Sequence, residues 1–491
     1  MIIKTDPDTI QNYLSDASNY RGSSDKVYIP DNSNELQKAV SECYFSKTPF
    51  TISGAGTGLT GGRVPQKGAI ISTENLNHII QIDENARLAK VQPGLLLSEL
   101  EMELNQNGFF FPPNPTEKNS SIGGNIAVNA SGSRTFKYGA YRNFVKSLNV
   151  ILPNGDEVFI PKNKYHVNNE ILKFSSLRNF SYSIPIYDIH MPDIKNASGY
   201  FMKNGMDAID LFIGNEGTLG VISEAELEFL PLPEKVLGLI VFFDSVDKLL
   251  TFVENIRITS KINNKLNYQD VSDISARSIE LYDAHALKIL QTYYPQIPHN
   301  VNGAVWIEQE MTEQNEDDII FKWYTLIADF TKFTDFIWTA LSENEHNTFR
   351  EFRHQLPLHI SEQILKVGFR KVGTDTAVPD DKFIPFYKFA KSLLDKSGIE
   401  YAIWSHAGNS HLHANLLPNS QQQFDDSVKI YDEIIHQTLI FGGTVSAEHG
   451  IGKLKKKYLI EMYGDEAIDC MRTVKKVLDP YNLLGRGNIF D

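Results

Sequence analysis

Two segments near the C-terminus carry the residue types of a divalent-metal site. The run His406-Ala-Gly-Asn-Ser-His-Leu-His413 contains Gly408 to turn the chain, and Glu448 follows in Ser446-Ala-Glu-His-Gly450. Two imidazoles and one carboxylate are ligands that Zn²⁺ accepts, and a set of three leaves positions open for a substrate. The sequence therefore predicts a Lewis-acid site made by His406, His413 and Glu448, with zinc as the expected ion.

The spacing in this run does not settle which histidines are the metal ligands. In a strand, His411, His413 and Asn415 would share a face, so His411 is a rival ligand on spacing alone. Any one of these histidines is also explained by an ordinary place in a strand or on the surface. The cluster gains meaning from a second feature far upstream.

That feature is a glycine-dense loop, Ser53-Gly-Ala-Gly-Thr-Gly-Leu-Thr-Gly-Gly62. Its glycines let backbone N–H groups approach phosphate oxygens, and Thr57 and Thr60 add hydroxyl donors. A nicotinamide-type fingerprint would open a helix, whereas Arg63-Val-Pro65 follows here and does not resemble a helix start. Alone, the loop is explained equally well as a glycine turn without a ligand.

Three further segments of glycine and small residues extend the pattern. They are Gln92-Pro-Gly94, the region from Pro115 to Gly132, and Gly214-Asn-Glu-Gly-Thr-Leu-Gly-Val-Ile222. Together they supply much closely approachable backbone, as an extended cofactor requires. A flavin-free zinc hydrolase with the same histidines would leave all four segments unexplained.

In combination, these motifs resemble the flavoprotein family typified by vanillyl-alcohol oxidase and para-cresol methylhydroxylase. Within it, the chain is similar to the FAD-dependent dehydrogenases of D-2-hydroxyacids, which include glycolate, D-lactate and D-2-hydroxyglutarate dehydrogenases. The resemblance runs from about residue 27 to the end of the chain. Thr57 stands where some relatives carry a histidine bonded to the flavin, so the resemblance implies non-covalent FAD. The implied FAD-binding residues are Ser53, Gly54, Ala55, Gly56, Thr57, Gly58, Leu59, Thr60, Gly61, Pro93, Gly94, Pro115, Thr116, Gly123, Gly124, Asn125, Asn129, Gly132, Glu216, Gly217, Gly220, Val221 and Ile222.

The resemblance also assigns roles in the histidine cluster. It implies His406, His413 and Glu448 as metal ligands, His449 as the catalytic base and Asn415 as a substrate contact. The chain has Gly408-Asn-Ser-His411 where relatives have Gly-Asp-Gly-Asn, which puts the shape of this loop in question.

Substrate-binding cations follow from the same resemblance. Arg353 matches the arginine with which relatives bind the substrate carboxylate, and Arg350 is close enough to be the alternative. Lys371 lies two residues earlier than the lysine of relatives, and an ordinary surface lysine is the competing interpretation.

The implied reaction oxidises a D-2-hydroxyacid to the 2-oxoacid. A metal on the hydroxyl and carboxylate lowers the hydroxyl pKa, His449 takes the proton, and the C2 hydride moves to flavin N5. The motifs do not identify the acid. Two alternatives within the fold are an oxygen-using 2-hydroxyacid oxidase and a non-redox flavoenzyme resembling alkylglycerone-phosphate synthase. That synthase has histidine where this chain has Glu448, so Glu448 favours the dehydrogenase.

Composition limits the partners. The formal charge of −14 argues against nucleic acid, and the longest apolar runs are far shorter than a membrane span. Only Cys43 and Cys470 are present, outside any C-x-x-C pair, so iron–sulfur clusters and c-type haem are not expected. The same low cysteine count leads us to expect a cytoplasmic location. Electrons must then pass to an external acceptor: a quinone, an electron-transfer flavoprotein, a cytochrome or oxygen. Whether the chain forms a homodimer stays open.

The elements that position these residues follow from periodicity. Apolar spacing predicts helices over 33–44 and 95–107 and strands over 49–53, 69–72 and 88–91. Prolines 231 and 233 mark the likeliest domain boundary. Beyond them we expect strands over 236–243, 303–310, 364–372, 399–405 and 412–417, and helices over 245–256, 317–330 and 381–397.

These expectations define an α+β fold of three parts. The resemblance implies that residues 1–230 form a two-subdomain FAD-binding domain of the vanillyl-alcohol oxidase and para-cresol methylhydroxylase type. Residues 231–423 form an α+β cap for the substrate, with an antiparallel or mixed sheet and helices on one side. Residues 424–491 form a helical segment that completes the active site.

Overall fold

The first domain is built on two sheets. The computed structural model describes residues 1–266 and 271–491 of the chain. One sheet has the strand order β1 (Ile2–Lys4), β2 (Lys26–Ile29), β4 (Ala69–Ser72) and β3 (Phe50–Ser53), in which β2, β4 and β3 are parallel. The other is antiparallel, in the order β5 (Ile79–Asp83), β6 (Leu88–Val91), β12 (Val221–Glu228), β8 (Val145–Ile151) and β9 (Glu157–Pro161). The strands predicted over 49–53, 69–72 and 88–91 are confirmed.

Amphipathic helices cover these sheets. In α2 (Ser33–Phe45) the predicted face of Leu36, Ala39, Val40 and Cys43 is fully buried, and α3 (Leu97–Gln106) buries its leucines. The shorter elements of this domain are α1 (Pro7–Ile10), β7 (Phe109–Phe110), α4 (Ile122–Ala127), α5 (Thr135–Tyr138), α6 (Tyr141–Phe144), β10 (Ile171–Ser175), β11 (Ser181–Pro185), α7 (Ala208–Phe212) and β13 (Leu230–Pro231).

The cap is built on one larger sheet. Its strand order is β17 (Trp338–Ala340), β14 (Lys235–Phe243), β16 (Gly303–Met311), β15 (Ala276–Asp283), β20 (Tyr401–His406), β21 (His411–Leu416) and β18 (Val372–Gly373), with β19 (Thr376–Ala377) also on β21. Every strand pair formed here by the described residues is antiparallel, which confirms the predicted antiparallel cap sheet.

Helices cover both faces of the cap sheet, so the prediction of helices on one side is wrong. Leu239 and Val241 of β14 face a core shared with α8 (Val246–Leu266), α10 (Glu316–Ala328) and α12 (Phe383–Ser397). Ile240 and Phe242, on the opposite face, pack with α9 (Ala284–Leu290) and α11 (Glu343–Val367). A sheet that is apolar on both faces requires a cover on both.

The strand predicted over 364–372 is also wrong. Residues 364–367 are the last turn of α11, which Gly368 ends in a left-handed conformation, and only Val372 and Gly373 pair with a neighbour. The apolar residues that suggested a strand lie on the exposed end of this helix, where Leu365 is 84% exposed. The buried face of α11 comes earlier, at Phe349, Phe352, Leu356 and Ile360.

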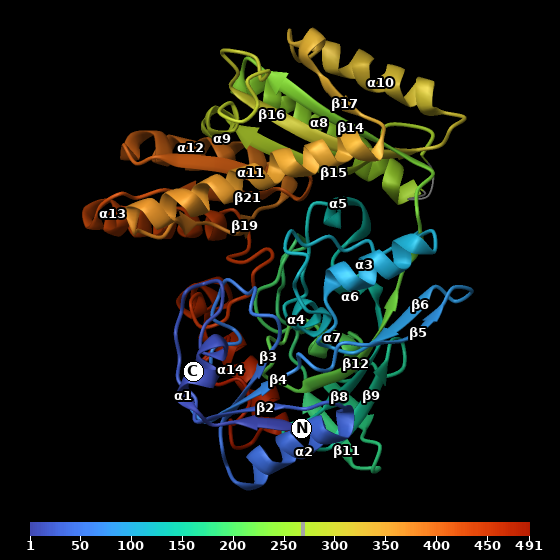
Figure 1. Ribbon diagram of the computed structural model, residues 1–491, viewed down its shortest axis with the longest axis vertical. Helices are drawn as coiled ribbons and strands as arrows, with labels where there is room; N and C mark the ends of the chain where they lie inside the picture. The colour runs from blue at the N-terminus through green and yellow to red at the C-terminus, as the bar shows by residue number, and fades with distance from the viewer. Residues whose placement is uncertain (267–270) are drawn as a thin grey trace.

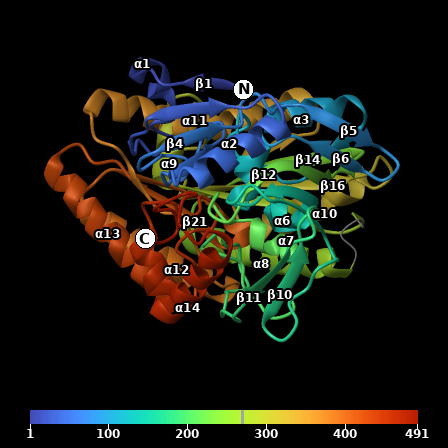
Figure 2. The same cartoon turned by 90° about the horizontal axis from the view of Figure 1, so that it is seen from below.

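The C-terminal segment is divided between the two domains. Helix α13 (Gln421–Ile440) adds Ile434 to the cap core, whereas α14 (Lys456–Leu478) returns to the first domain and buries Leu459 and Met471 in its core. Both helices lie along the same side of the molecule (Figure 2). The loop that joins them, residues 441–455, therefore passes from one domain to the other and carries Glu448 and His449.

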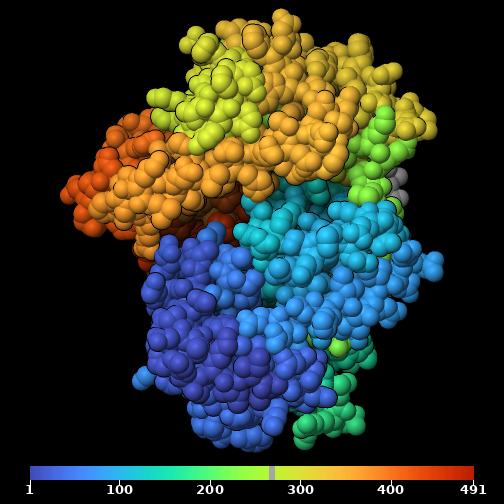
Figure 3. Space-filling view, in the orientation of Figure 1, coloured from blue at the N-terminus to red at the C-terminus, as the bar shows by residue number. Residues whose placement is uncertain are grey.

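The two domains stack along the long axis (Figure 1), and α5 of the first domain reaches into the cap. Phe136 of α5 belongs to the cap core. A Cβ added to Gly408 would lie 2.7 Å from the Phe136 ring, so only glycine lets this contact form. A hollow remains between the domains, in which the C-terminal segment is visible (Figure 3). Among the described residues, no helix is long and apolar enough to cross a membrane.

Candidate active site

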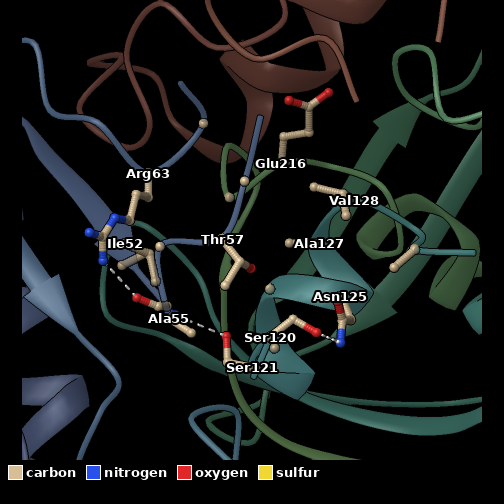
Figure 4. Close-up of a pocket in the computed structure, with 18 of the residues that line it drawn as sticks. Ile52, Ala55, Thr57, Arg63, Ser120, Ser121, Asn125, Ala127, Val128 and Glu216 are labelled. Atoms are coloured by element: carbon tan, nitrogen blue, oxygen red, sulfur yellow. Dashed lines mark hydrogen bonds between the residues drawn. The ribbon is translucent and has the colours of Figure 1, made fainter. Parts of the chain in front are cut away.

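The glycine-rich segments meet in one cavity of the first domain. It is lined by residues 54–60 of the glycine loop, Gly123 to Asn125 of α4, and residues 215–217 and 220–222. Figure 4 shows Thr57, Asn125 and Glu216 bordering this pocket from three separate segments. Pro93, Pro115 and Thr116 complete the predicted part of the lining.

Arg63 holds the glycine loop in shape. Its guanidinium donates to the Gly54 carbonyl at 3.1 Å, to Ser53 Oγ at 3.2 Å and to the Ser15 carbonyl at 2.7 Å. Gly56 has a φ of 83°, and a Cβ there would lie 2.3 Å from Cζ of Arg63. The loop therefore needs glycine at this position both for its backbone conformation and for the arginine packed beneath it.

Five predicted FAD-binding residues lie outside the lining. Gly94 and Gly132 allow close backbone packing, because a Cβ would lie 2.0 Å from the Thr73 carbonyl oxygen and 1.9 Å from the Asn114 carbonyl oxygen, respectively. The others are Ser53 beneath Arg63, Gly61 beside Tyr20, and Asn129, whose side chain accepts the Arg142 backbone N–H. Sequence composition could not separate glycines that border a ligand from glycines that let two backbone segments touch.

The lining fits an extended dinucleotide. Gly62 and Gly217 both border the cavity, and a Cβ built on either meets no protein atom within 4 Å. Glycine at position 62 keeps backbone open to the cavity, as expected for a wall that a cofactor contacts closely, whereas Gly217 also has a φ of 66°, which itself favours glycine.

The predicted metal ligands converge between the domains. His406 ends β20 and His413 lies on the adjacent strand β21, and Glu448 reaches them from the interdomain loop. Nε2 of His406 lies 3.4 Å from Oε1 of Glu448, and Nε2 of His413 lies 3.6 Å from Oε2. This donor set fits a divalent cation of borderline softness such as Zn²⁺.

Both histidines are oriented through their other ring nitrogen. Nδ1 of His406 donates to Glu280 at 2.6 Å, and Nδ1 of His413 donates to the Thr374 carbonyl at 3.0 Å. Such partners fix each ring and turn its Nε2 toward Glu448. Burial disfavours the charged form of His406, but Glu280 and Glu448 outweigh it and raise the pKa of this histidine.

His411 belongs to the same cluster. One ligand atom from each of His406, His411, His413 and Glu448 lies within 4.8 Å of the others. Nε2 of His411 donates to Asp375 at 3.0 Å, and its buried Nδ1 has no hydrogen-bond partner among the described residues. The geometry thus places His411 beside the three predicted ligands.

Asp375 organises the loop that carries Glu448 and His449. Its carboxylate accepts the backbone N–H groups of both residues, at 3.1 and 3.0 Å, and pairs with Lys455 at 2.8 Å. Burial lowers the pKa of His449 to about 4, so its imidazole is neutral at neutral pH, as a base must be. Glu448 and His449 also line the glycine-bordered cavity, so both sites share one space.

Lys195 is a site residue that the sequence did not reveal. Its ammonium lies 2.5 Å from Oε1 of Glu448 and donates to the Gly132 carbonyl at 3.3 Å. Burial alone would raise the pKa of Glu448, but Lys195 and then His406 hold it well below its ordinary value. Lys195 is a lone lysine in an irregular segment, so no local pattern marked it.

The structure separates the two candidate arginines. Arg353 is largely buried, lies 3.4 Å from Glu280 and donates to Thr116 Oγ1 at 3.2 Å, beside the flavin-type cavity. Arg350 instead pairs with Glu343 on the exposed side of α11.

Lys371 and Asn415, predicted separately, lie together. The Lys371 ammonium donates to Oδ1 of Asn415 at 2.8 Å. Lys371 is exposed as a whole residue, whereas Asn415 is buried beside His413 on β21. The pair therefore links the surface to the strand that carries the histidines.

Known proteins place this architecture in a family. The model described as FAD linked oxidases, C-terminal domain, matches residues 232–489, and the model described as FAD binding domain matches residues 24–160. The chain belongs to the FAD-linked oxidase family. FAD is therefore the cofactor for which the first domain is built, as the resemblance implied.

Relatives span nearly the whole chain. Glycolate oxidase subunit GlcD of Bacillus subtilis is 28% identical, over 97% of this chain and 92% of its own. D-lactate dehydrogenase of Anaerostipes hadrus is 28% identical over 93% and 87%, and D-2-hydroxyglutarate dehydrogenase of Stutzerimonas stutzeri is 25% identical over 99% and 96%. A solved alkyldihydroxyacetonephosphate synthase shares the fold at a TM-score of 0.67, with 15% identity over 98% of this chain and 81% of its own.

Proposed function

We propose that this FAD-linked oxidase is a dehydrogenase of D-2-hydroxyacids that uses a divalent metal, zinc, held by His406, His413 and Glu448. One observation carries the proposal. Glu448 faces Nε2 of both histidines and, with the adjacent His449, also borders the cavity of the FAD-binding segments. The proposal includes a cytoplasmic location and an external acceptor: a quinone, an electron-transfer flavoprotein, a cytochrome or oxygen.

The side chains at the site have the chemistry that this reaction needs. Arg353 offers a guanidinium for the substrate carboxylate, and Asn415 on β21 with the nearby Lys371 offers further donors. His449, neutral and with Nδ1 toward Asp375, takes the hydroxyl proton at Nε2. When bound, a divalent cation supplies Lewis-acid polarisation of the substrate oxygens, and FAD supplies a hydride acceptor. The relatives named for glycolate, D-lactate and D-2-hydroxyglutarate support this substrate class.

Anaerobic flavin reduction tests the proposal. The purified holoenzyme is mixed with a panel of D-2-hydroxyacids and, as matched controls, their L enantiomers, and flavin absorbance is followed. We expect at least one D acid to bleach the flavin with its L partner inactive. Bleaching by the L acids alone, or by neither set, would count against the assignment.

A second candidate is a non-redox flavoenzyme of the synthase type. Lys195 favours it, because its ammonium lies 2.5 Å from Oε1 of Glu448 and offers this carboxylate a cationic partner from the chain itself. This reading predicts purified protein without stoichiometric metal and a flavin that no hydroxyacid reduces. Elemental analysis together with the anaerobic assay therefore separates the two candidates.

A further inference from the structure

A second cavity lies beside the proposed substrate position. Its volume is about 630 Å³, and it is bordered by first-domain residues around Asn114 and Arg134 and by β15, β16 and α11 of the cap. This second cavity shares Pro115 and Thr116 with the cavity of the FAD-binding segments. Arg353 lines the second cavity and donates to Thr116. A substrate held by Arg353 could therefore extend into this space.

Arg134 is the unusual cation of this cavity. Its side chain is only 18% exposed, yet its guanidinium makes no hydrogen bond with any residue that the structure describes, and its buried Nε is without a partner. The nearest carboxylate, Glu308, is 3.9 Å away and already binds Arg277 at 2.9 Å. A guanidinium has five N–H donors, and leaving them unused in a poorly hydrated place is costly.

The neighbouring cations do have partners. Lys118 pairs with Glu101 at 2.7 Å, Arg277 with Glu308, and Arg353 with Glu280 at 3.4 Å. Burial lowers the pKa of Lys118, and the charges of Arg134 and Arg353 lower it further, against the opposing effect of Glu101. The lining also holds Glu101, Glu280 and Glu308, which are these partners, so Arg134 stands out as the cation whose donors are unused.

The backbone fixes Arg134 near the reaction site. Gly132 packs on the Asn114 carbonyl, and the residues after Arg134 form α5, whose Lys137 pairs with Glu310 of the cap at 2.7 Å. Ser131, three residues before Arg134, lies 3.4 Å from Glu448 through its hydroxyl. Three residues span at most about 11 Å between Cα atoms. A substrate with a short carbon chain, together with the Arg134 side chain, covers that distance.

We propose that Arg134, assisted by Lys118, binds a second carboxylate of the substrate, so that the enzyme prefers D-2-hydroxydicarboxylates to monocarboxylic D-2-hydroxyacids. Arg353 takes the carboxylate next to the reacting carbon, and Arg134 takes the distal one. This specificity rests on the proposed function, because it assumes that the reacting carbon lies at the Glu448 cluster. Charge-assisted, bidentate recognition is what an unbonded guanidinium offers a carboxylate.

The test uses a matched pair of acids of equal chain length. D-2-hydroxyglutarate and D-2-hydroxypentanoate differ by a carboxylate in place of a terminal methyl group. Anaerobic flavin reduction is measured with both acids for wild type, Arg134→Gln, Arg134→Lys and, as a surface control, Arg472→Gln. FAD content and Tm are recorded for each protein to show that it is folded.

In wild type we expect kcat/KM for the dicarboxylate to exceed that for the monocarboxylate by roughly 10²-fold or more. Arg134→Gln should remove most of this preference by lowering only the dicarboxylate value, Arg134→Lys should keep part of it, and Arg472→Gln should change nothing. Equal kcat/KM for the two acids in wild type, or an Arg134→Gln protein that keeps the preference or loses both activities equally, overturns the inference.

Failure of the proposed function would be recognised separately. If neither acid reduces the wild-type flavin, the dehydrogenase assignment loses its support, and Arg134 is then tested by binding alone. Glutarate and pentanoate are titrated against the oxidised holoenzyme by flavin absorbance. Tighter binding of glutarate that Arg134→Gln abolishes supports the second carboxylate site, whereas equal binding of both contradicts it.

Discussion

The carboxylate of Asp375 accepts the backbone N–H of His449 at 3.0 Å and lies 3.3 Å from Nδ1 of the same histidine. It also accepts the backbone N–H of Glu448. One buried acid on the cap side therefore orients the proposed base and a proposed metal ligand together. Because Nδ1 faces Asp375, Nε2 is the nitrogen left for the substrate proton.

Asp375→Asn should impair both stability and catalysis. The change leaves Lys455, which pairs with Asp375 at 2.8 Å, as a buried cation without a charged partner. Breaking such a pair costs about 3 to 5 kcal/mol, so Tm should fall clearly. In the folded fraction, flavin reduction should slow while KM changes less, because the base is misplaced. A Tm and a reduction rate equal to wild type would remove Asp375 from its assigned role.

Glu448 and His449 are adjacent in sequence but should respond differently to substitution. Glu448→Ala removes a proposed metal ligand, so metal content by elemental analysis should drop while FAD stays. His449→Asn removes only the proposed base, so metal and FAD should stay while flavin reduction slows by roughly 10² to 10⁴-fold. The account fails here if both variants keep metal, or if both lose it.

Arg353→Ala should lower kcat/KM for every 2-hydroxyacid, because the carboxylate next to the reacting carbon is common to all of them. Loss of a desolvated charge pair costs about 2 to 5 kcal/mol, or roughly 30-fold and more in kcat/KM. Arg350→Gln is the matched comparison, since Arg350 pairs with Glu343 at the exposed side of the same helix. If Arg350→Gln lowered kcat/KM for flavin reduction more than Arg353→Ala does, the substrate-binding role would pass to Arg350.

The FAD should be released completely by acid precipitation. Thr57 lines the cavity where a histidyl link would form in some relatives, and its hydroxyl offers no comparable nucleophile. The measurement is flavin absorbance in the supernatant and in the washed pellet. Flavin that stays with the denatured polypeptide would show a covalent bond at another residue.

The apolar pattern of consecutive residues predicted those helices and strands that are determined by which of their own residues are buried. Leu36 to Cys43 at helical spacing gave α2, and apolar strand runs gave β14 and β16, because burial of one repeating face is written into consecutive residues. The region of α11 was misjudged because Pro357 and many polar residues hide a helical face that only its packing partners reveal.

A site residue could be predicted where a sequence motif marks it. It could not be predicted where only its contact with a residue far away in the sequence gives it a role. The resemblance pointed to His406, His413 and Glu448, which the structure brings together. Glu280 is 126 residues from His406, and Lys195 is 253 residues from Glu448, so no spacing rule connects them. Their roles arise from the meeting of two domains, which periodicity cannot specify.

The most direct test of the central claim is flavin reduction before and after metal removal. The holoenzyme is dialysed against a strong chelator, its FAD and metal contents are measured, and anaerobic bleaching by an active D-2-hydroxyacid is followed before and after Zn²⁺ is restored. We predict that the metal-free enzyme keeps its FAD, loses most of its reduction rate and regains it with Zn²⁺. A metal-free enzyme that reduces its flavin at the full rate would contradict the account.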